Sequence, residues 1–335
     1  MRNVAVLPPV KNELNAVLLN LAAFKNSDIE AADTMMYAPL NAADLTLDFY
    51  DRGRIATWVR EHTGLVPWVR EKAGRSIAGW RPFGAWACAP DGITGEYLLD
   101  NKIRIRTDAE TSDSRLGPLD GIQRIREQLR QPRKVVRLVG LSGVGKTRLV
   151  QALFDERVGA ESLNPALAVY TDIADGPDPR PTDLAHSLIA SRSTAILIID
   201  NCPPDLHRRL SDVCRAPESR VSILTVEYDI REDQPEGTEV LRLEPSSPEL
   251  IEKLVRRRFP HISVVDSRTI AEFSGGNARI AIVLSETVGR QDTIAGMSDD
   301  HLFKRLFQQG NDASESLPRC AGVIARLFIS KRRCF

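Results

Sequence analysis

A glycine-rich stretch at residues 140–147 has the residue types and spacing of a phosphate-binding loop. Gly140 is followed by four residues and then by Gly145, Lys146 and Thr147, which matches the pattern GxxxxGK[ST]. Glycines let the backbone turn sharply and present its N–H groups to phosphate oxygens. We expect Lys146 to reach the β- and γ-phosphates of a nucleotide and the Thr147 hydroxyl to bind Mg²⁺. The predicted nucleotide-binding residues are Gly140, Leu141, Ser142, Gly143, Val144, Gly145, Lys146, Thr147 and Arg148.

A carboxylate, Asp200, closes the aliphatic run 194–200 downstream of this loop. A buried strand places its last side chain at the C-terminal edge of the sheet, where ligands bind in open α/β folds. We expect Asp200 to hold Mg²⁺ through water. Asn201 follows where many ATP-hydrolysing enzymes have a glutamate, and an amide cannot accept a proton from the attacking water at pH 7. Asn201 alone therefore predicts slow hydrolysis.

These groups need a sheet to position them, and the sequence pattern that follows Pro132 predicts one. Continuous aliphatic runs alternate with amphipathic helices, which is typical of a parallel sheet covered on both faces. A helix with Ile122, Ile125 and Leu129 on one face is expected to end before Pro132. The expected strands are 134–140, 166–173, 194–200, 220–228 and 238–245, and the expected helices between them are 146–158, 181–192 and 204–214.

From Ser246 onward the pattern is helical, which predicts a small helical unit after the sheet. The expected helices are 246–259, 266–276, 277–289 and 298–310. Ser246 and Glu249 have the spacing of a capping box at the start of the first helix. The basic run 253–261 has two interpretations, contact with phosphate or nucleic acid and a solvated helix end.

The first 116 residues are expected to form a separate, mostly helical region whose role the sequence does not identify. All four tryptophans lie between Trp58 and Trp86, and the tetrapeptide WVRE occurs twice there. Buried aromatic side chains dominate core energetics, so we expect Trp58 and Trp68 to pack a small helical core. The alternating stretch 92–107 predicts a strand or hairpin, followed by a linker. No nuclease-type pattern of acidic residues and lysine is assigned in this region.

Composition sets further bounds on the function. Of 335 residues, 42% are hydrophobic and 27% are charged, as in an ordinary globular protein with a real core. Lys+Arg and Asp+Glu both number 45, so the charge of the whole chain favours neither nucleic acid nor membranes. Five cysteines and five histidines show no metal-site spacing. We expect a reduced, cytoplasmic protein, since no signal peptide or transmembrane run is recognisable.

The segments VVRLVGLSGVGKTRLVQALF, AILIIDN, SRVSILTVEYD, LRLEPSSPELIEKLV and IAEFSGGNARIAIVL together resemble the signal-transduction ATPases with numerous domains (the STAND class). They also resemble the related AAA+ proteins of the origin-recognition type. The resemblance covers about 117–310 and implies a P-loop NTPase with a five-stranded parallel sheet and a helical lid. It implies bound ATP or ADP with Mg²⁺, and assembly into homo-oligomers in the ATP state. The implied domains are 1–116, a nucleotide-binding domain at 117–245, a lid at 246–311, and at 312–335 a tail or the start of a truncated further domain.

The resemblance also assigns roles to two positions outside the loop. Thr225 stands where relatives have a polar residue that senses the γ-phosphate, and Arg279 in GGNAR stands for a lid arginine that reaches the phosphates. Relatives often have an arginine two positions after Thr225, where this chain has Glu227. We expect Glu227 to supply the carboxylate missing at Asn201, the alternative being a solvated surface glutamate. For Arg279 the alternative is an exposed helix position. The candidate catalytic residues are Lys146, Asp200, Asn201, Thr225, Glu227 and Arg279, and the candidate metal ligands are Thr147 and Asp200.

The expected function is a Mg·ATP-binding switch with slow hydrolysis, whose output is assembly or exposure of an effector. Two alternatives stay open. One is an AAA+-like ATPase that acts on nucleic acid, for which the sequence offers no selective signal. The other is a scaffold that holds nucleotide with negligible turnover. No membrane partner is expected.

Overall fold

The computed structural model describes residues 57–59, 61–72, 77–82, 97–100, 102, 105–107, 115–228, 238–289 and 293–307. The chain divides into two compact units, Met1–Thr57 and Trp58–Phe335. Every element below belongs to the second unit. The predictions for residues 1–56, for most of the stretch 92–104 and for the tail at 312–335 lie outside the described residues.

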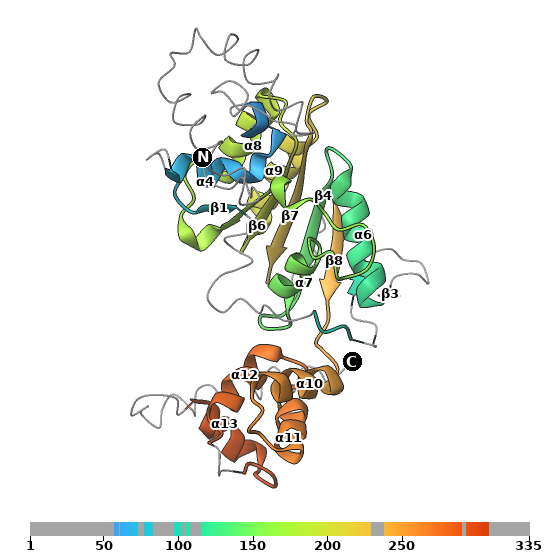
Figure 1. Cartoon of the computed structure of the whole chain (residues 1–335), viewed down its shortest axis with the longest axis vertical. Coiled ribbons are helices and arrows are strands. Elements are labelled where there is room, and N and C mark those ends of the chain that lie inside the picture. The colour runs from blue at the N-terminus through green and yellow to red at the C-terminus, as the bar shows by residue number, and fades with distance from the viewer. Residues whose placement is uncertain are drawn as a thin grey trace, which may run out of the picture. The chain divides into compact units, whose positions relative to one another are not determined.

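A mixed sheet forms the centre of the second unit (Figure 1). Its strands are β1 (Trp80–Pro82), β2 (Ile105–Thr107), β3 (Arg115–Leu116), β4 (Val135–Val139), β5 (Ala168–Asp172), β6 (Ala195–Asp200), β7 (Val221–Glu227) and β8 (Glu239–Leu243). In the described part of the chain the order is β1-β5-β6-β7-β4-β8-β2-β3. The neighbours β5, β6, β7, β4 and β8 pair in parallel, which confirms the predicted five-stranded parallel sheet.

The prediction of five strands was incomplete, because three short antiparallel strands extend the sheet at its two edges. All three come from the region predicted to be separate. Trp80 in β1 is buried, and its indole N–H donates to the carbonyl of Pro179. Ile105 in β2 is fully buried against Gly121. The described residues of this region thus contribute edge strands to the sheet. β2 lies within the stretch 92–107, for which a strand or hairpin was predicted, whereas β1 and β3 were not predicted.

The structure differs from the predicted tryptophan core at Trp58. The side chain of Trp58 is 40% exposed and lies against the ring of His62, with ring centroids 4.9 Å apart. The side chain of Trp68 lies outside the described residues. Trp80, which was not singled out, is the described tryptophan that enters the core, where it packs with Ile77 and Val169.

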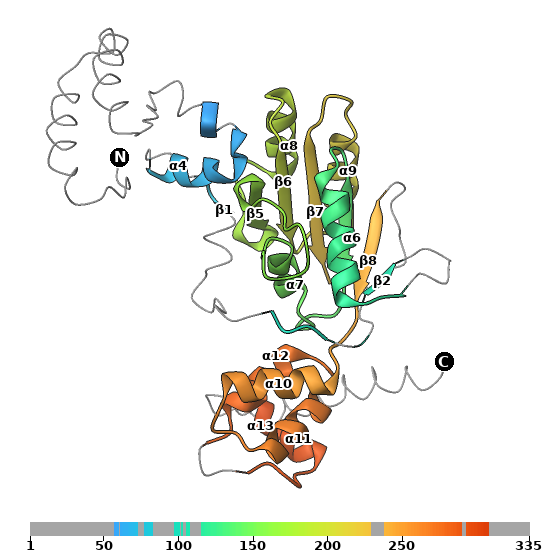
Figure 2. The same ribbon diagram turned by 45° about the vertical axis from the view of Figure 1, so that its right-hand side comes forward.

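Helices cover both faces of the sheet, as the alternating pattern predicted (Figure 2). Strand residues alternate between the two faces: Val136 and Leu138 pack with α6 and α7, whereas Val135 and Ile223 pack with α8 and α9. In the described ranges, the helices that precede β8 are α4 (Val66–Lys72), α6 (Pro118–Arg130), α7 (Lys146–Ala152), α8 (Pro181–Ala190) and α9 (Pro204–Cys214), with 3-10 turns at Thr63–Leu65, Pro165–Leu167 and Ile173–Asp175.

The helix α7 is shorter than the predicted 146–158 because Arg126 ends it. Arg126, on α6, is fully buried, and its guanidinium donates to five main-chain carbonyls between Ala152 and Ala160. These bonds satisfy carbonyls that would otherwise accept from the next helical turn. The chain therefore leaves the helix after Ala152, and Leu153 and Phe154 enter the core from a turn.

Among the residues that the structure describes, four helices follow β8 and form a lid with its own core, as predicted. They are α10 (Pro248–Arg258), α11 (Val264–Ser274), α12 (Ala278–Glu286) and α13 (Asp299–Phe307). The predicted capping box at Ser246 was wrong by one residue, since the hydroxyl of Ser247 accepts from the N–H of Leu250. The N–H of Ser246 instead donates to the carbonyl of Gly276. None of the helices in the described ranges combines the length and apolar character needed to cross a membrane.

Candidate nucleotide-binding site

The loop 140–147 joins the end of β4 to the start of α7, as predicted. Two of its glycines hold left-handed backbone angles, with φ of 82° at Gly143 and 101° at Gly145. Residues with a Cβ rarely adopt such angles, so the glycines are required by the turn itself. Gly143 is also crowded, because a Cβ there would lie 2.2 Å from Oδ1 of Asn277. The loop conformation therefore depends on Gly145, which belongs to the sequence pattern, and on Gly143, which stands at one of its variable positions.

Lys146 connects this loop to the carboxylates at the sheet edge. Its Nζ donates to the carbonyls of Gly140 and Leu141 at 2.7 and 3.0 Å. Burial lowers the pKa of Lys146, and the nearby charges of Asp200 and Glu227 oppose that shift. One lysine thus lies within electrostatic reach of both carboxylates that the sequence singled out.

Asp200 is the last residue of β6, and β7 separates that strand from β4. Its Oδ1 accepts from the N–H of Asn201 at 2.9 Å, and its Oδ2 accepts from the hydroxyl of Tyr170 at 3.3 Å. Burial raises the pKa of Asp200, and repulsion from Asp172 adds to the rise. The carboxylate is thus oriented by two donors and partly removed from water.

Asn201 does not face the loop with its amide. It has a left-handed backbone angle, with φ of 51°, and its Nδ2 donates to both carboxylate oxygens of Asp172 at 2.9 Å. Asp172 ends β5 and is the register partner of Asp200. Sequence reasoning missed Asp172, although this acidic residue stands next to last in the predicted strand 166–173. The adjacency of β5 and β6 was the information needed to bring the two acids together.

Glu227 lies where the sequence placed it. It is the last residue of β7, the strand between β6 and β4, and it pairs in register with Val139. The side chain is half-buried, and its Oε1 accepts from the N–H of Tyr228 at 2.8 Å. Burial lowers the pKa of Lys146, and the charge of Glu227 opposes this shift. Glu227 is therefore a second carboxylate, besides Asp200, at the edge of the sheet beside the loop.

Thr225, by contrast, is not brought to the loop. The strand continues for two residues beyond it, and its side chain is fully buried. Its Oγ1 lies 2.8 Å from Nδ1 of His207, and Nε2 of that ring lies 3.3 Å from Oγ1 of Thr238. Burial lowers the pKa of His207 to about 3, so the ring is neutral at pH 7. The predicted contact of Thr225 with the γ-phosphate therefore lacks the geometry it needs, because the hydroxyl is engaged in the core.

The lid contacts the loop through the start of α12. Nδ2 of Asn277 donates to the carbonyl of Ser142 at 2.7 Å, and the N–H of Arg279 lies 3.4 Å from the carbonyl of Gly143. Oδ1 of Asn277 caps the helix by accepting from Arg279 and Ile280. Arg279 thus lies beside the loop with an exposed side chain. Asn277 was missed, although asparagine before a helical run is a recognised N-cap signal.

Two further loop-side residues have different surroundings. Arg148 lies over the ring of Tyr97, with its Cζ 5.8 Å from the ring centroid, and donates to Gln151. Thr147 is exposed in the first turn of α7. Within the described ranges no three His, Cys, Asp or Glu side chains form a metal-binding group. Mg²⁺ in nucleotide sites is commonly held by one or two carboxylates and by phosphate oxygens, and the oriented carboxylate of Asp200 with the exposed hydroxyl of Thr147 fits that donor set.

The sheet order and the loop between β4 and α7 are those of a P-loop NTPase with a helical lid. No protein-family model matches the chain, and no curated protein matches it in sequence. Solved structures are similar to it in fold. One is a signal transduction ATPase with numerous domains and a tetratricopeptide repeat sensor from Pyrococcus horikoshii, with 15% identity, a TM-score of 0.37, and coverage of 65% of this chain and 35% of that one.

Two other similar structures have comparable scores. The RuvB Holliday junction branch migration motor of Thermotoga maritima has 16% identity, a TM-score of 0.36, and coverage of 56% of this chain and 68% of that one. The ORC2 protein of Aeropyrum pernix has 16% identity, a TM-score of 0.38, and coverage of 65% and 72%. Scores of this size assign neither a family nor an activity to the chain.

Proposed function

We propose that the chain binds Mg·ATP at the loop 140–147 and hydrolyses it slowly, and that the bound nucleotide controls assembly or an effector. The observation that carries this proposal is the convergence of Lys146, Asp200 and Glu227. They come from three elements, α7, β6 and β7, and both carboxylates act on the charge of the lysine. A phosphate-binding loop beside a metal-binding carboxylate and a residue that positions water is a recurring arrangement in phosphoryl transfer.

Each residue of this group has a distinct role in the proposal. Lys146 binds the β- and γ-phosphates, and Asp200 and Thr147 hold Mg²⁺, which neutralises charge on the phosphates when bound. Glu227 orients the attacking water and accepts its proton, since it is the half-buried carboxylate on the strand between the loop and Asp200. Arg279, whose N–H meets Gly143, approaches the phosphates from the lid.

Slow turnover follows from the contact that Asn201 makes. Its amide is bound to Asp172 and cannot accept a proton, so the position that usually carries the base contributes none. General-base catalysis typically contributes about 10²–10⁴-fold to a rate. The proposal therefore assigns the remaining base catalysis to Glu227 and expects a low rate even with that residue present.

The switch part of the proposal rests on the bond between the lid and the loop. Asn277 caps α12 and also donates to Ser142 in the loop, so a change in the loop reaches the first turn of a lid helix. A two-state lid biased by the nucleotide would pass the state of the loop to the surface of the chain.

The experiment compares the 335-residue chain and Lys146→Ala. Nucleotide affinity and turnover are measured by equilibrium binding and phosphate release, and particle size by light scattering with ADP and with a non-hydrolysable ATP analogue. We expect slow turnover that Lys146→Ala abolishes, and a size or shape that differs between the two nucleotides. Normal ATP affinity without turnover would favour the nucleotide-holding scaffold, which the amide at Asn201 makes the second candidate. Equal size in both states would contradict the switch.

A further inference from the structure

The first helix of the lid, α10, is capped at its N-terminus by a distant part of the chain. The N–H of Ser247, its N-cap residue, donates to Oδ2 of Asp100 at 2.8 Å, although the two residues are 147 positions apart. In a capping box a Glu or Gln three residues after the N-cap accepts this bond, but Leu250 stands there. Asp100 and Ser247 are both buried. A long-range carboxylate therefore takes the place of a local cap.

The pairing of β2 with β8 brings this carboxylate to the lid. The two strands are antiparallel, and Ile105, the first residue of β2, is the register partner of Leu243, the last residue of β8. Residues before Ile105 therefore lie beyond the end of β8, where the chain passes into the lid. The N–H of Lys102 also donates to Oδ1 of Asp100, at 3.2 Å. Both oxygens of the carboxylate are thus held by main-chain donors.

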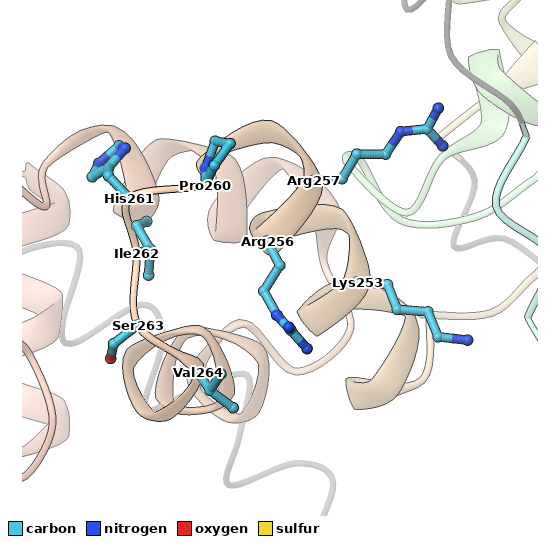
Figure 3. Close-up of a pocket in the computed structure, with 8 residues that line it drawn as sticks. All are labelled: Lys253, Arg256, Arg257, Pro260, His261, Ile262, Ser263 and Val264. Atoms are coloured by element: carbon cyan, nitrogen blue, oxygen red, sulfur yellow. The ribbon is translucent and has the colours of Figure 1, made fainter.

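The same segment reaches the helix that follows the phosphate loop. We call its described residues, 97–100 and 102, the strap. Arg148 on α7 lies over the ring of Tyr97 in the strap, with its Cζ 5.8 Å from the ring centroid. Figure 3 shows that Arg257, in the last turn of α10, extends away from the turn that leads into α11. Burial lowers the pKa of Arg148, and the charge of Arg257 contributes to that shift. The strap and α10 therefore both lie near α7.

A short series of hydrogen bonds connects the capped end of α10 to the phosphate loop. Ser246, next to Ser247, donates its N–H to the carbonyl of Gly276 at 2.9 Å. Gly276 has a φ of 83°, and a Cβ there would lie 2.2 Å from the carbonyl oxygen of Ser246, so the two backbones are in direct contact. Asn277 follows, and its Nδ2 donates to the carbonyl of Ser142 at 2.7 Å. The first turn of α10 is thus connected to the loop through the start of α12.

We propose that Asp100 is a positioning residue, which holds the lid against the phosphate loop and thereby sets the affinity for ATP. This inference rests on the proposed function, since ATP is the ligand whose affinity it concerns. Without Asp100 the buried N–H of Ser247 would lose its acceptor, and an unsatisfied buried donor is costly, so the first turn of α10 would move. That movement would reach Asn277 through Ser246 and Gly276. The strap therefore affects the nucleotide site without contacting the nucleotide.

A second contact between the strap and α10 is too exposed to have this effect. Nζ of Lys102 lies 3.4 Å from Oε2 of Glu249, and the two side chains are 61% and 70% exposed. Exposed ion pairs of this kind contribute little to stability. Lys102→Gln removes the pair and keeps the main-chain N–H that donates to Asp100. It is therefore a control on the strap itself.

The first measurement is hydrogen exchange of the nucleotide-free 335-residue chain, followed by mass spectrometry. In Asp100→Ala we expect faster exchange in peptides that cover 140–147 and 277–281. Asp100→Asn, which keeps an acceptor oxygen, should show a smaller change. Lys102→Gln should match the unaltered chain, and so should Asp183→Ala, the same substitution at an exposed position in the first turn of α8. A change confined to the first turn of α10 would overturn the proposal, because a merely local cap has that effect.

The second measurement is the affinity for a fluorescent ATP analogue, by anisotropy. Asp100→Ala should bind the analogue about 5-fold or more weakly, which is the lower end of typical coupling between sites, and Asp100→Asn should lie between it and the unaltered chain. Equal affinity in Asp100→Ala and the unaltered chain would contradict this inference alone, whereas an unaltered chain that does not bind the analogue would contradict the proposed function. Circular dichroism checks folding. If Asp100→Ala is unfolded, Asp100→Asn decides by the same two measurements.

Discussion

The amide of Asn201 donates to both carboxylate oxygens of Asp172, each at 2.9 Å, across the ends of two neighbouring strands. The residue that stands in place of the usual catalytic acid is therefore a bridge between β6 and β5. Its left-handed backbone directs the side chain to that neighbour. Restoring an acid at this position would place it against another acid, which gives the first prediction.

Asn201→Asp should destabilise the chain, because two carboxylates would face each other where a donor now meets an acceptor. The loss of a hydrogen bond to a charged group with added repulsion is expected to cost about 1–3 kcal/mol. Thermal unfolding followed by circular dichroism at pH 7 measures the effect. The exchanged double variant, Asp172→Asn with Asn201→Asp, restores one donor and one acceptor and should recover most of the stability. If the double variant is less stable than Asn201→Asp alone, the bridge is not the cause.

Asp200→Asn should stabilise the nucleotide-free chain while weakening Mg²⁺-dependent ATP binding. Burial raises the pKa of Asp200, so the ionised carboxylate is less favourable in the folded chain than in the unfolded one. Stability from this group is present below its unfolded pKa and is lost as pH rises through the raised folded pKa. We therefore expect a higher Tm at pH 7, measured by circular dichroism, because asparagine carries no charge that burial disfavours.

The same variant tests whether Asp200 binds the metal. ATP affinity is measured by titration with Mg²⁺ and with excess EDTA, and the difference between the two should vanish in Asp200→Asn. A variant that keeps its full Mg²⁺ dependence would show that another residue holds the metal.

His207 should make the chain labile in acid. Its folded pKa of about 3 lies below the ordinary histidine value of 6.5, because the ring is buried beside Thr225 and near Arg137. Between about pH 6.5 and pH 3 the His207 ring is protonated in the unfolded chain and neutral in the folded chain. The free energy of unfolding therefore falls as pH falls through this window. His207→Gln should reduce the slope of stability against pH by about one proton between these values. Urea unfolding at several pH values tests this, and an unchanged slope would show that His207 is protonated when folded.

Asn277 should couple the lid to the phosphate loop through its amide. Asn277→Ser keeps an N-cap for α12 but is too short to reach the carbonyl of Ser142, whereas Asn277→Ala removes both contacts. We expect Asn277→Ala to lose about 1 kcal/mol of stability and Asn277→Ser markedly less. Both should show the same change in ATP affinity, measured by titration calorimetry. If only Asn277→Ala alters ATP affinity, the lid is coupled to the loop through the N-cap of α12 and not through the contact with Ser142.

The sequence was sufficient for the parts of the fold that have a strong local pattern. Five aliphatic runs became the parallel strands, and Gly140 to Thr147 became the loop between the first of them and a helix. Glu227 could be placed because the carboxyl ends of all strands in a parallel sheet lie at the same edge. In these cases local pattern and tertiary position agree, so composition and spacing carry the information.

Other features depend on long-range contacts that no local pattern records. The edge strand containing Trp80 is stabilised by its pairing with β5. The early end of α7 results from Arg126, which is distant in sequence. The position of Thr225 was misjudged because the length of β7, not the polarity of the residue, decides which side chain reaches the edge. The partnership of Asn201 with Asp172 required the strand order.

Single-turnover hydrolysis by Glu227→Gln tests the central claim most directly. Protein is held in excess over radiolabelled ATP with Mg²⁺, and the rate of phosphate formation is compared with that of the unaltered chain and of Glu239→Gln, a matched substitution on β8. The account predicts that Glu227→Gln keeps its ATP affinity and loses about 10²-fold or more in rate, as removal of a general base does, while Glu239→Gln retains the rate. An unchanged rate in Glu227→Gln would contradict the claim that this carboxylate completes the site.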